Sequence, residues 1–196
     1  MLQTKFLNQK IILASQSPRR QSLLKELLID FEVRVKDNLE EIYPLELKNI
    51  EIAPYLSELK FNAFVSELVE NEFLITSDTT VCIENDVLNK PLDRADAIEI
   101  LKRLSGKKHT VVTGVTIGNN KNRTTFSSFT DVYFRELFID EICFYIDNYK
   151  PFDKAGAYGI QEWIGYVAIE RIDGSFYNVM GLPVQKLHEE LLKFEL

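Results

Sequence analysis

The chain has 196 residues, of which 45% are hydrophobic, and its formal net charge is −7 with an isoelectric point of about 5.0. This length and composition predict one compact domain over residues 1–196, or two lobes, and exclude a disordered chain. The negative charge repels nucleic acid and anionic membranes, so we expect neither as a partner, and a polyanionic ligand needs a local basic pocket. The sequence shows neither a secretory leader nor an apolar run of about 18 residues, which indicates a cytoplasmic protein with reduced thiols at Cys82 and Cys143.

The first predicted strand and helix are joined by a turn rich in hydroxyl and guanidinium groups. Residues 10–13 form a short apolar run that predicts a buried strand. Ser17 can cap the following helix and Pro18 suits its first position. The expected buried face of this helix is Leu23, Leu24, Leu27 and Leu28. Because the helix start lies beside Ser15, Arg19 and Arg20, the turn predicts an anion-binding site. The alternative is a well-capped surface helix with solvated arginines.

Three further elements are expected in the first half of the chain. Residues 31–35 predict a second strand, and an acidic loop with Glu40 and Glu41 follows it. A helix is expected over about 53–69, with Pro54 in its first turn. The apolar face of this helix, which leaves Lys60 outside it, is Leu56, Leu59, Ala63 and Phe64. The next elements are an apolar strand over 73–83 and, interrupting it, the tetrapeptide 77–80.

The second half of the chain continues the alternation of helices and strands. Asp93 is expected to cap a helix that stops at Gly106. The inward face of this helix is Ala97, Ile98, Leu101 and Leu104. The remaining elements are strands over 109–117, 124–136 and 166–171, a hairpin turn over 118–122, a helix over 140–149, and a terminal helix that opens at Pro183 and buries Val184, Leu187, Leu191 and Leu192. This order predicts an α/β fold with a mixed central sheet flanked by helices.

Asp78 is the most informative single residue of the predicted strands. An ionised carboxylate is costly to bury, so Asp78 must meet a cation, a hydrogen-bond donor or a cleft. Close to arginines, it could ligate a divalent metal or act as a general base on water. The alternative is a turn aspartate that accepts backbone N–H bonds. Lys90, which precedes Pro91 ahead of a helix, is a weaker candidate for the same site.

The segment over residues 153–161 has the composition of a nucleotide-binding loop. Its glycines and alanines permit close backbone approach, while Lys154, Tyr158 and Gln161 offer a charge, a ring and an amide. Gln161 could read the edge of a base, and the alternative is a glycine-softened connection. The later segment over residues 178–183 is interpreted as structural, as is His109 at a strand start.

Taken in order, these motifs resemble the Maf family of nucleoside triphosphate pyrophosphatases over nearly the whole chain. The resemblance is carried by Leu13-Ala14-Ser15, Ser17-Pro18-Arg19-Arg20, Ser77-Asp78-Thr79, Lys90-Pro91, Leu104-Ser105-Gly106, Thr113-Gly114, the run from Asp153 to Gln161, Asn178-Val179 and Gly181-Leu182-Pro183. It implies metal-dependent hydrolysis of a nucleoside triphosphate between its α and β phosphates. It also implies an α/β fold of two lobes with a substrate cleft, similar to that of the inosine triphosphate pyrophosphatases.

The resemblance also implies roles for single residues. Asp78 matches the family's general base, and the positions that match phosphate contacts are Ser15, Arg19, Arg20, Lys60 and Lys90. Glu41 falls near an acidic position that assists the metal, although Glu40 could take the same place. The resemblance therefore implies a divalent cation, Mg²⁺ or Mn²⁺, held by Asp78 and Glu41. The implied catalytic set is Asp78, Lys60, Lys90 and Glu41.

Within the family, three residues bear on the substrate. Arg20, Thr79 and Gln161 resemble the branch that hydrolyses dTTP and UTP, and Lys154 is a further expected substrate contact. The chain departs from the family pattern over residues 162–165, which replace a more glycine-rich segment, so Trp163 bears on the shape of the pocket.

Other functions remain open at this stage. The alternatives are a nonenzymatic nucleotide-binding regulator of septum formation, and a pyrophosphatase for 7-methylguanosine triphosphate or for inosine and xanthosine triphosphates. In each case the expected partner is a small-molecule nucleotide, and a homodimer is compatible with the sequence.

Overall fold

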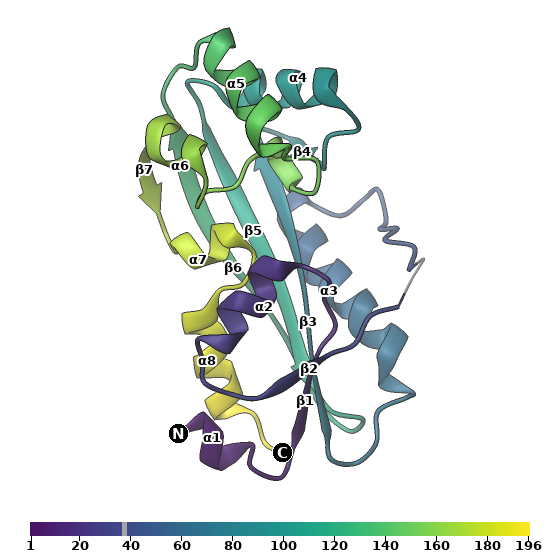
Figure 1. The fold of residues 1–196 in the computed structure, drawn as a ribbon. Helices are drawn as coiled ribbons and strands as arrows, with labels where there is room; N and C mark the ends of the chain where they lie inside the picture. The colour runs from purple at the N-terminus through teal and green to yellow at the C-terminus, as the bar shows by residue number, and fades with distance from the viewer. Residues whose placement is uncertain (37–38) are drawn as a thin grey trace. The chain divides into compact units, whose positions relative to one another are not determined.

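The structure is a computed structural model that describes residues 1–36 and 39–196 and contains a seven-stranded sheet (Figure 1). The strands are β1 (Lys10–Leu13), β2 (Phe31–Val33), β3 (Glu72–Ile83), β4 (Asp86–Leu88), β5 (Lys108–Gly118), β6 (Arg123–Phe134) and β7 (Ile169–Asp173). Their order is β2-β1-β3-β5-β6-β7, and β4 pairs with β3 outside this path. β1 is parallel to β2 and β3, whereas β4 is antiparallel to β3 and β7 is antiparallel to β6. The predicted mixed sheet is therefore confirmed.

Helices flank the strands, as predicted (Figure 1). They are α1 (Leu2–Lys5), α2 (Pro18–Lys25), α3 (Asn49–Val65), α4 (Arg94–Leu104), α5 (Ile139–Tyr149), α6 (Trp163–Ala168), α7 (Phe176–Met180) and α8 (Val184–Lys193), with one turn of 3₁₀ helix, η1 (Ala155–Ala157). Among the described residues, no helix has both the length and the hydrophobicity that a membrane span requires.

The chain divides into two compact units. Unit 1 comprises Met1–Asp78, Thr113–Ser128 and Gly181–Leu196, and unit 2 comprises Thr79–Val112 and Phe129–Met180. Three strands, β3, β5 and β6, continue from one unit into the other. The expectation of a single domain over residues 1–196 and of a substrate cleft stays a prediction.

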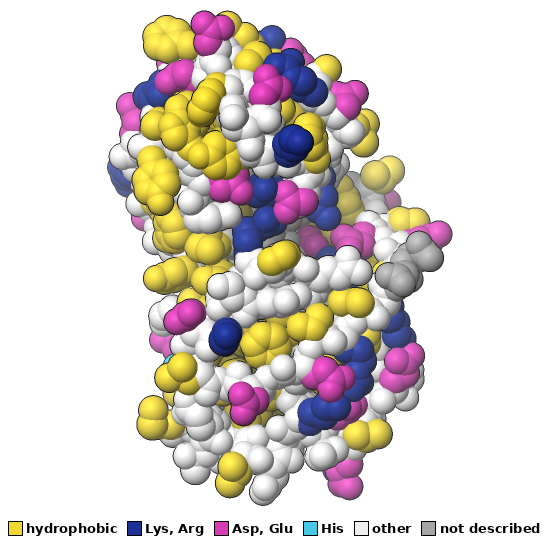
Figure 2. All heavy atoms as spheres, viewed as in Figure 1, with side chains coloured by type: hydrophobic (Ala, Val, Ile, Leu, Met, Phe, Trp, Pro, Cys, Tyr) yellow, Lys and Arg dark blue, Asp and Glu magenta, His cyan; other side chains and the backbone are white. Residues whose placement is uncertain are grey.

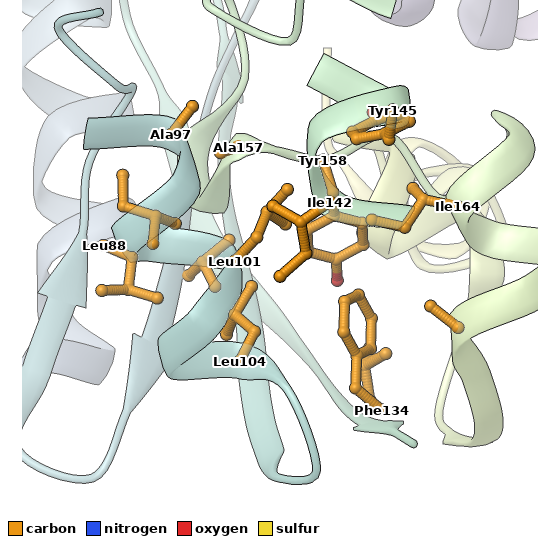
Figure 3. Close-up of a cluster of buried hydrophobic side chains, with 14 of the residues drawn as sticks. Leu88, Ala97, Leu101, Leu104, Phe134, Ile142, Tyr145, Ala157, Tyr158 and Ile164 are labelled. Atoms are coloured by element: carbon orange, nitrogen blue, oxygen red, sulfur yellow. The ribbon is translucent and has the colours of Figure 1, made fainter. Parts of the chain in front are cut away.

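Each unit has its own hydrophobic core. In unit 1, β1 contributes a run of buried residues, because a parallel strand covered on both faces has no solvent side. The core around it is Ile12, Ala14, Phe61, Phe64, Leu68 and Leu74. In unit 2, side chains of α4 and α5 pack against Phe134, Tyr158 and Ile164 (Figure 3). The segment over residues 153–161 therefore rests on the core of unit 2.

Several local predictions are confirmed. β1 has the predicted bounds, and Asp93 caps α4 by accepting a hydrogen bond from the Asp96 amide at 2.9 Å. The predicted turn between β5 and β6 is closed by a bond from the Asn119 amide to the Asn122 carbonyl at 2.9 Å. Both cysteines are free thiols, and burial raises the pKa of Cys82.

The helix expected over 53–69 begins and ends four residues earlier, as α3 (Asn49–Val65). It begins earlier because the Glu51 carboxylate accepts a hydrogen bond from the Lys48 amide at 3.0 Å, which caps the helix there. Pro54 therefore lies inside the helix and not in its first turn. Two residues of the expected face, Leu59 and Ala63, are only half-buried.

The strand expected over 166–171 is wrong at its start. Residues up to Ala168 belong to α6, and β7 begins at Ile169. Ile164 and Ala168, which lie four residues apart, are both buried. That spacing puts both side chains on one face of a helix, so packing on the core prevails over the strand preference of the apolar residues.

The remaining corrections are small. β3 runs without a break through the tetrapeptide 77–80, because Ser77 and Asp78 there bond within the fold, to the Gly181 carbonyl and to Lys60. α2 ends at Lys25, and Leu28 takes a left-handed backbone with φ of 55° and is exposed. Leu192 of α8 is also exposed. β2 and β6 end two residues before their predicted ends.

Candidate functional site

Lys60 brings together two carboxylates of unit 1. Its ammonium Nζ lies 2.5 Å from Asp78 Oδ1 and 3.0 Å from Glu41 Oε1. The Lys60 and Asp78 side chains are 14% and 12% exposed, whereas Glu41 is half-exposed. Buried charges require such pairing, because an unpaired ion loses its hydration. Asp78 is therefore paired with the ammonium group of Lys60. Of the two acidic candidates in the loop, Glu40 and Glu41, it is Glu41 for which a contact with Lys60 is described.

Lys60 is held in place because α3 packs closely on β3 and β5. The Thr76 hydroxyl donates a hydrogen bond to the Ser57 carbonyl at 2.7 Å, and the Ser57 and Thr116 hydroxyls lie 2.9 Å apart. Gly114 of β5 permits this approach, since a Cβ there would lie 2.4 Å from the Ala53 carbonyl oxygen. The Thr113-Gly114 motif therefore has a packing role, which sequence reasoning had not assigned.

The turn between β1 and α2 has the local structure predicted for it. The Ser17 hydroxyl accepts the Arg20 amide at 3.4 Å, which caps α2, and the Ser15 hydroxyl accepts the Ser17 amide at 3.2 Å. Gln21 Nε2 donates to the Ser15 carbonyl at 3.1 Å. Ser15 is buried, and these contacts fix its backbone and the position of its hydroxyl oxygen.

Arg20 joins three segments of unit 1. Its Nε donates to the Gly181 carbonyl at 2.9 Å and its Nη1 to the Ser77 carbonyl at 2.7 Å. Gly181 has a φ of 113°, a conformation that favours glycine. Sequence reasoning missed this partner of Arg20, and the glycine in the Gly181-Leu182-Pro183 motif was the available signal.

The charges of unit 1 influence one another. Burial lowers the pKa of the Arg20 guanidinium, the carboxylates of Asp78 and Glu41 oppose that shift, and Arg19 adds to it. The structure therefore brings Arg19, Arg20, Lys60, Asp78 and Glu41 within electrostatic reach of one another. Basic and acidic side chains are also interspersed on the face drawn in Figure 2. In a protein with a net charge of −7, this cluster thus holds three cationic side chains and two carboxylates.

In the described part of the chain, this cluster offers a metal ion the two carboxylates of Asp78 and Glu41. Among the described residues, no group of three or more His, Cys, Asp or Glu side chains could hold a metal ion. Mg²⁺ commonly binds through one or two protein carboxylates together with substrate phosphates and water. The pair formed by Asp78 and Glu41 fits a cation of this kind.

The other predicted site residues belong to unit 2. Thr79 follows Asp78 in β3 and is half-buried, and Lys90 is exposed beyond β4. Residue 89 is tied to the 153–161 segment, because the Gly156 amide donates to the Asn89 carbonyl at 3.2 Å. Lys154 is buried, with its Nζ 2.8 Å from Asp153 Oδ1 and 3.1 Å from Glu162 Oε1.

Gln161 carries an unpaired buried atom. Its Oε1 is shielded from solvent and has no hydrogen-bond partner among the described residues. Leaving a buried acceptor without a donor costs free energy, so such an atom is often satisfied by a ligand. Trp163, the next large side chain, packs edge-on against Phe144 with ring centroids 4.9 Å apart and leans on the core of unit 2.

The residues interpreted as structural behave as expected. Asn178 is buried, and its Nδ2 donates to the Val111 carbonyl at 3.1 Å and the Thr130 hydroxyl at 2.9 Å. His109 is buried near the start of β5, with its Nε2 2.8 Å from the Tyr158 hydroxyl.

The fold is that of an α/β protein with a mixed central sheet flanked by helices, and unit 1 holds a cluster of paired charges. The family model described as Maf-like protein matches residues 10–194, and the chain belongs to this family. The chain is 52% identical over 191 residues to a dTTP/UTP pyrophosphatase of Flavobacterium johnsoniae, with 97% of this chain and 98% of that protein covered. It is 48% identical over 184 residues to a dTTP/UTP pyrophosphatase of Bacteroides thetaiotaomicron, with 94% and 95% covered.

A solved structure supports the fold alone. A HAM1 protein from Coxiella burnetii superposes with a TM-score of 0.51 at 13% identity, covering 95% of this chain and 100% of that one. The predicted likeness in fold to the inosine triphosphate pyrophosphatases is in keeping with this match.

Proposed function

We propose that the protein hydrolyses dTTP and UTP, or modified forms of them, to the nucleoside monophosphate and pyrophosphate, and so cleanses the nucleotide pool. The observation that carries the proposal is the contact of Lys60 with both Asp78 and Glu41 beside the anion-binding turn. The dTTP/UTP pyrophosphatases that are about half identical over nearly the whole chain support the choice of reaction and substrate.

The reaction requires an activated water and compensation of negative charge. In the proposed mechanism, Asp78 takes a proton from the water that attacks the α phosphorus, and the bond to the bridging oxygen breaks. Arg19, Arg20 and Lys60, joined by Lys90, stabilise the charge that develops on the departing pyrophosphate. The Ser15 hydroxyl orients a phosphate oxygen. A divalent cation, Mg²⁺ or Mn²⁺, held by Asp78 and Glu41 would polarise the phosphate oxygens.

Base selection is assigned to residues of unit 2. Uracil and thymine present an N3–H donor between two carbonyl acceptors, so the unpaired Oε1 of Gln161 could accept the N3–H. Thr79 adds a hydroxyl, and Lys154 lies in the same segment as Gln161. A guanine base presents a different order of donors and acceptors, which leaves buried groups of the site unpaired.

We propose that the substrate is a free nucleotide of the cytoplasm rather than nucleic acid. The net charge of −7 supports this choice, because it repels a polyanion that cannot enter a small basic site.

The test is pyrophosphate release from dTTP, UTP, GTP, ATP and 7-methylguanosine triphosphate with Mg²⁺ or Mn²⁺, and again after chelation of the metal. We expect dTTP and UTP to be hydrolysed with the highest kcat/KM, and chelation to abolish turnover. A higher kcat/KM for 7-methylguanosine triphosphate would contradict the assigned substrate. Unchanged turnover after chelation would contradict the role of the cation.

A further inference from the structure

Glu162 links the two ends of the 154–162 segment to each other and to α5, all within unit 2. Its Oε1 lies 3.1 Å from Lys154 Nζ, and its Oε2 accepts a hydrogen bond from the Tyr145 hydroxyl of α5. The same hydroxyl accepts the Gly159 amide at 3.0 Å. Tyr145 is fully buried, and the Glu162 side chain is 18% exposed. One carboxylate therefore holds a lysine and, through a tyrosine, the backbone of the segment.

This arrangement depends on the ionised carboxylate and on a glycine. Burial, together with the bond to Glu162, raises the pKa of Tyr145, so its hydroxyl stays a donor at neutral pH. A carboxylate can accept from Tyr145 and Lys154 at once, whereas an amide would turn donor hydrogens toward one of them. A Cβ at position 159 would lie 2.8 Å from Glu162 Cδ. Gly159 thus leaves the room in which the carboxylate sits.

Gln161 lies between these two fixed points. Gly159 precedes it by two residues, Glu162 follows it directly, and its Oε1 is buried and lacks a hydrogen-bond partner among the described residues. An oxygen that accepts a hydrogen bond from a base must be held in a fixed position, because a small displacement removes most of the energy of the hydrogen bond.

We propose that Glu162 is a positioning residue for base recognition, holding the 154–162 segment so that Gln161 presents its amide to the pyrimidine. The inference rests on the proposed function, since it takes a pyrimidine nucleotide as the substrate. Glu162 thus secures the proposed base-reading segment with a charged contact to Lys154 and a hydrogen bond from Tyr145.

A purely structural role for Glu162 predicts a different result. Loss of a structural contact lowers stability and affects phosphate binding and base binding alike. Loss of a positioning contact affects the base alone. Inorganic triphosphate separates the two, because as a competitive inhibitor it carries the phosphates without a base.

The first experiment compares Glu162→Gln and Gln161→Ala with the control Glu141→Gln. Glu141 is a suitable control because it is also a half-buried glutamate, bonded to Arg135 at 2.7 and 3.0 Å. We expect Glu162→Gln and Gln161→Ala to lower kcat/KM for UTP roughly 10- to 100-fold while the inhibition constant of inorganic triphosphate stays within about twofold. The control should change neither quantity by more than about twofold.

The second experiment displaces the carboxylate without removing it. Gly159→Ala should push Glu162 aside and lower kcat/KM for UTP, and it should have little further effect in a Glu162→Gly background. Unchanged kcat/KM for UTP in both Glu162→Gln and Gly159→Ala, or a parallel rise in the inhibition constant of inorganic triphosphate, would overturn the proposal. Failure of the unmodified protein to hydrolyse UTP would overturn the proposed function instead.

Discussion

At the scale of single residues, Lys60 decides how the acidic groups of unit 1 coexist. Asp78 and Glu41 would repel each other if brought together alone, and the ammonium between them removes that repulsion. The same ammonium is a phosphate ligand in the proposed mechanism. The pair of carboxylates is therefore kept close before substrate binds.

Asp78→Asn should leave the fold intact and reduce kcat for dTTP by about 10²–10⁴-fold. The amide can neither take a proton from water nor hold a cation as strongly as the carboxylate. Steady-state kinetics at saturating metal measure the effect, with thermal unfolding as the check on the fold. Near-normal turnover in the folded variant would show that Asp78 is not the base.

The two neighbouring arginines should both matter for turnover. Replacing either by alanine should raise KM for dTTP and lower kcat, because both charges contact phosphate in the proposed mechanism. Arg20→Ala should also lower the unfolding temperature, since its guanidinium bonds the Gly181 and Ser77 carbonyls. An Arg20→Ala variant with the unfolding temperature of the unmodified protein would contradict the joining role of Arg20.

At the scale of elements, the position of α3 on β5 sets the position of Lys60. The backbone of Ala53 and Pro54 approaches Gly114 so closely that no side chain fits between them. Helices normally keep their distance from a sheet through side chains, so this contact requires glycine at one point.

Gly114→Ala should reduce the free energy of unfolding by roughly 3 kcal/mol, because the added methyl group meets backbone that cannot turn away. Gly106→Ala is the control, since its Cβ would meet the flexible Glu136 side chain at 3.1 Å and its φ of 68° is the main obstacle. The control should cost about 1 kcal/mol. Urea unfolding measures both, and a Gly114→Ala variant as stable as the unmodified chain would contradict the packing role.

The sequence allowed prediction of elements whose signals are local. β1 and the capped α4 follow from a short apolar run and from Asp93. α6 was missed because its apolar residues have strand preference, and only the packing of Ile164 and Ala168 on the core makes them helical. The start of α3 could not be predicted because its N-cap is Lys48, a residue type that seldom caps helices, and the bond to Glu51 is a feature of the folded chain.

The same distinction applies to the candidate site. The turn that carries Arg19 and Arg20 is local in sequence and was predicted. The bond from Arg20 to Gly181 spans most of the chain, so the glycine of the Gly181-Leu182-Pro183 motif marks a special backbone position but does not name Arg20 as its partner. The choice of Glu41 over Glu40 likewise needed the position of Lys60.

At the scale of the whole molecule, stability should fall in mild acid because of His109. Burial lowers the pKa of His109 to about 4, from 6.5 as the ordinary value, and Asp131 only partly opposes this. In the unfolded chain, His109 therefore binds a proton near its ordinary pKa. In the folded chain, His109 binds a proton only at a much lower pH. The contribution of neutral His109 to the free energy of unfolding is complete above the ordinary pKa of the group, and it is lost as the pH falls toward about 4.

Between about pH 7 and pH 5 this group should account for a loss of about 2 kcal/mol. His109→Gln should show a smaller loss over the same range, because its amide does not titrate. Urea unfolding at the two pH values measures the difference. Equal pH dependence in the two proteins would show that His109 is not buried as a neutral group.

The two compact units contribute different parts of the proposed reaction. Unit 1 contains Asp78, Lys60, Glu41 and the arginine turn, to which the proposal assigns the phosphates. Unit 2 contains Gln161, to which the proposal assigns the base, and Lys90, the remaining proposed phosphate contact. The formation of a homodimer stays a prediction.

The central claim is that water attacks the α phosphate. It is tested most directly by hydrolysing dTTP in water enriched in the heavy oxygen isotope and measuring the masses of the products by mass spectrometry. The account predicts equal amounts of dTMP and pyrophosphate, with the heavy oxygen in the dTMP phosphate. Heavy oxygen in the pyrophosphate, or release of orthophosphate with dTDP, would contradict it.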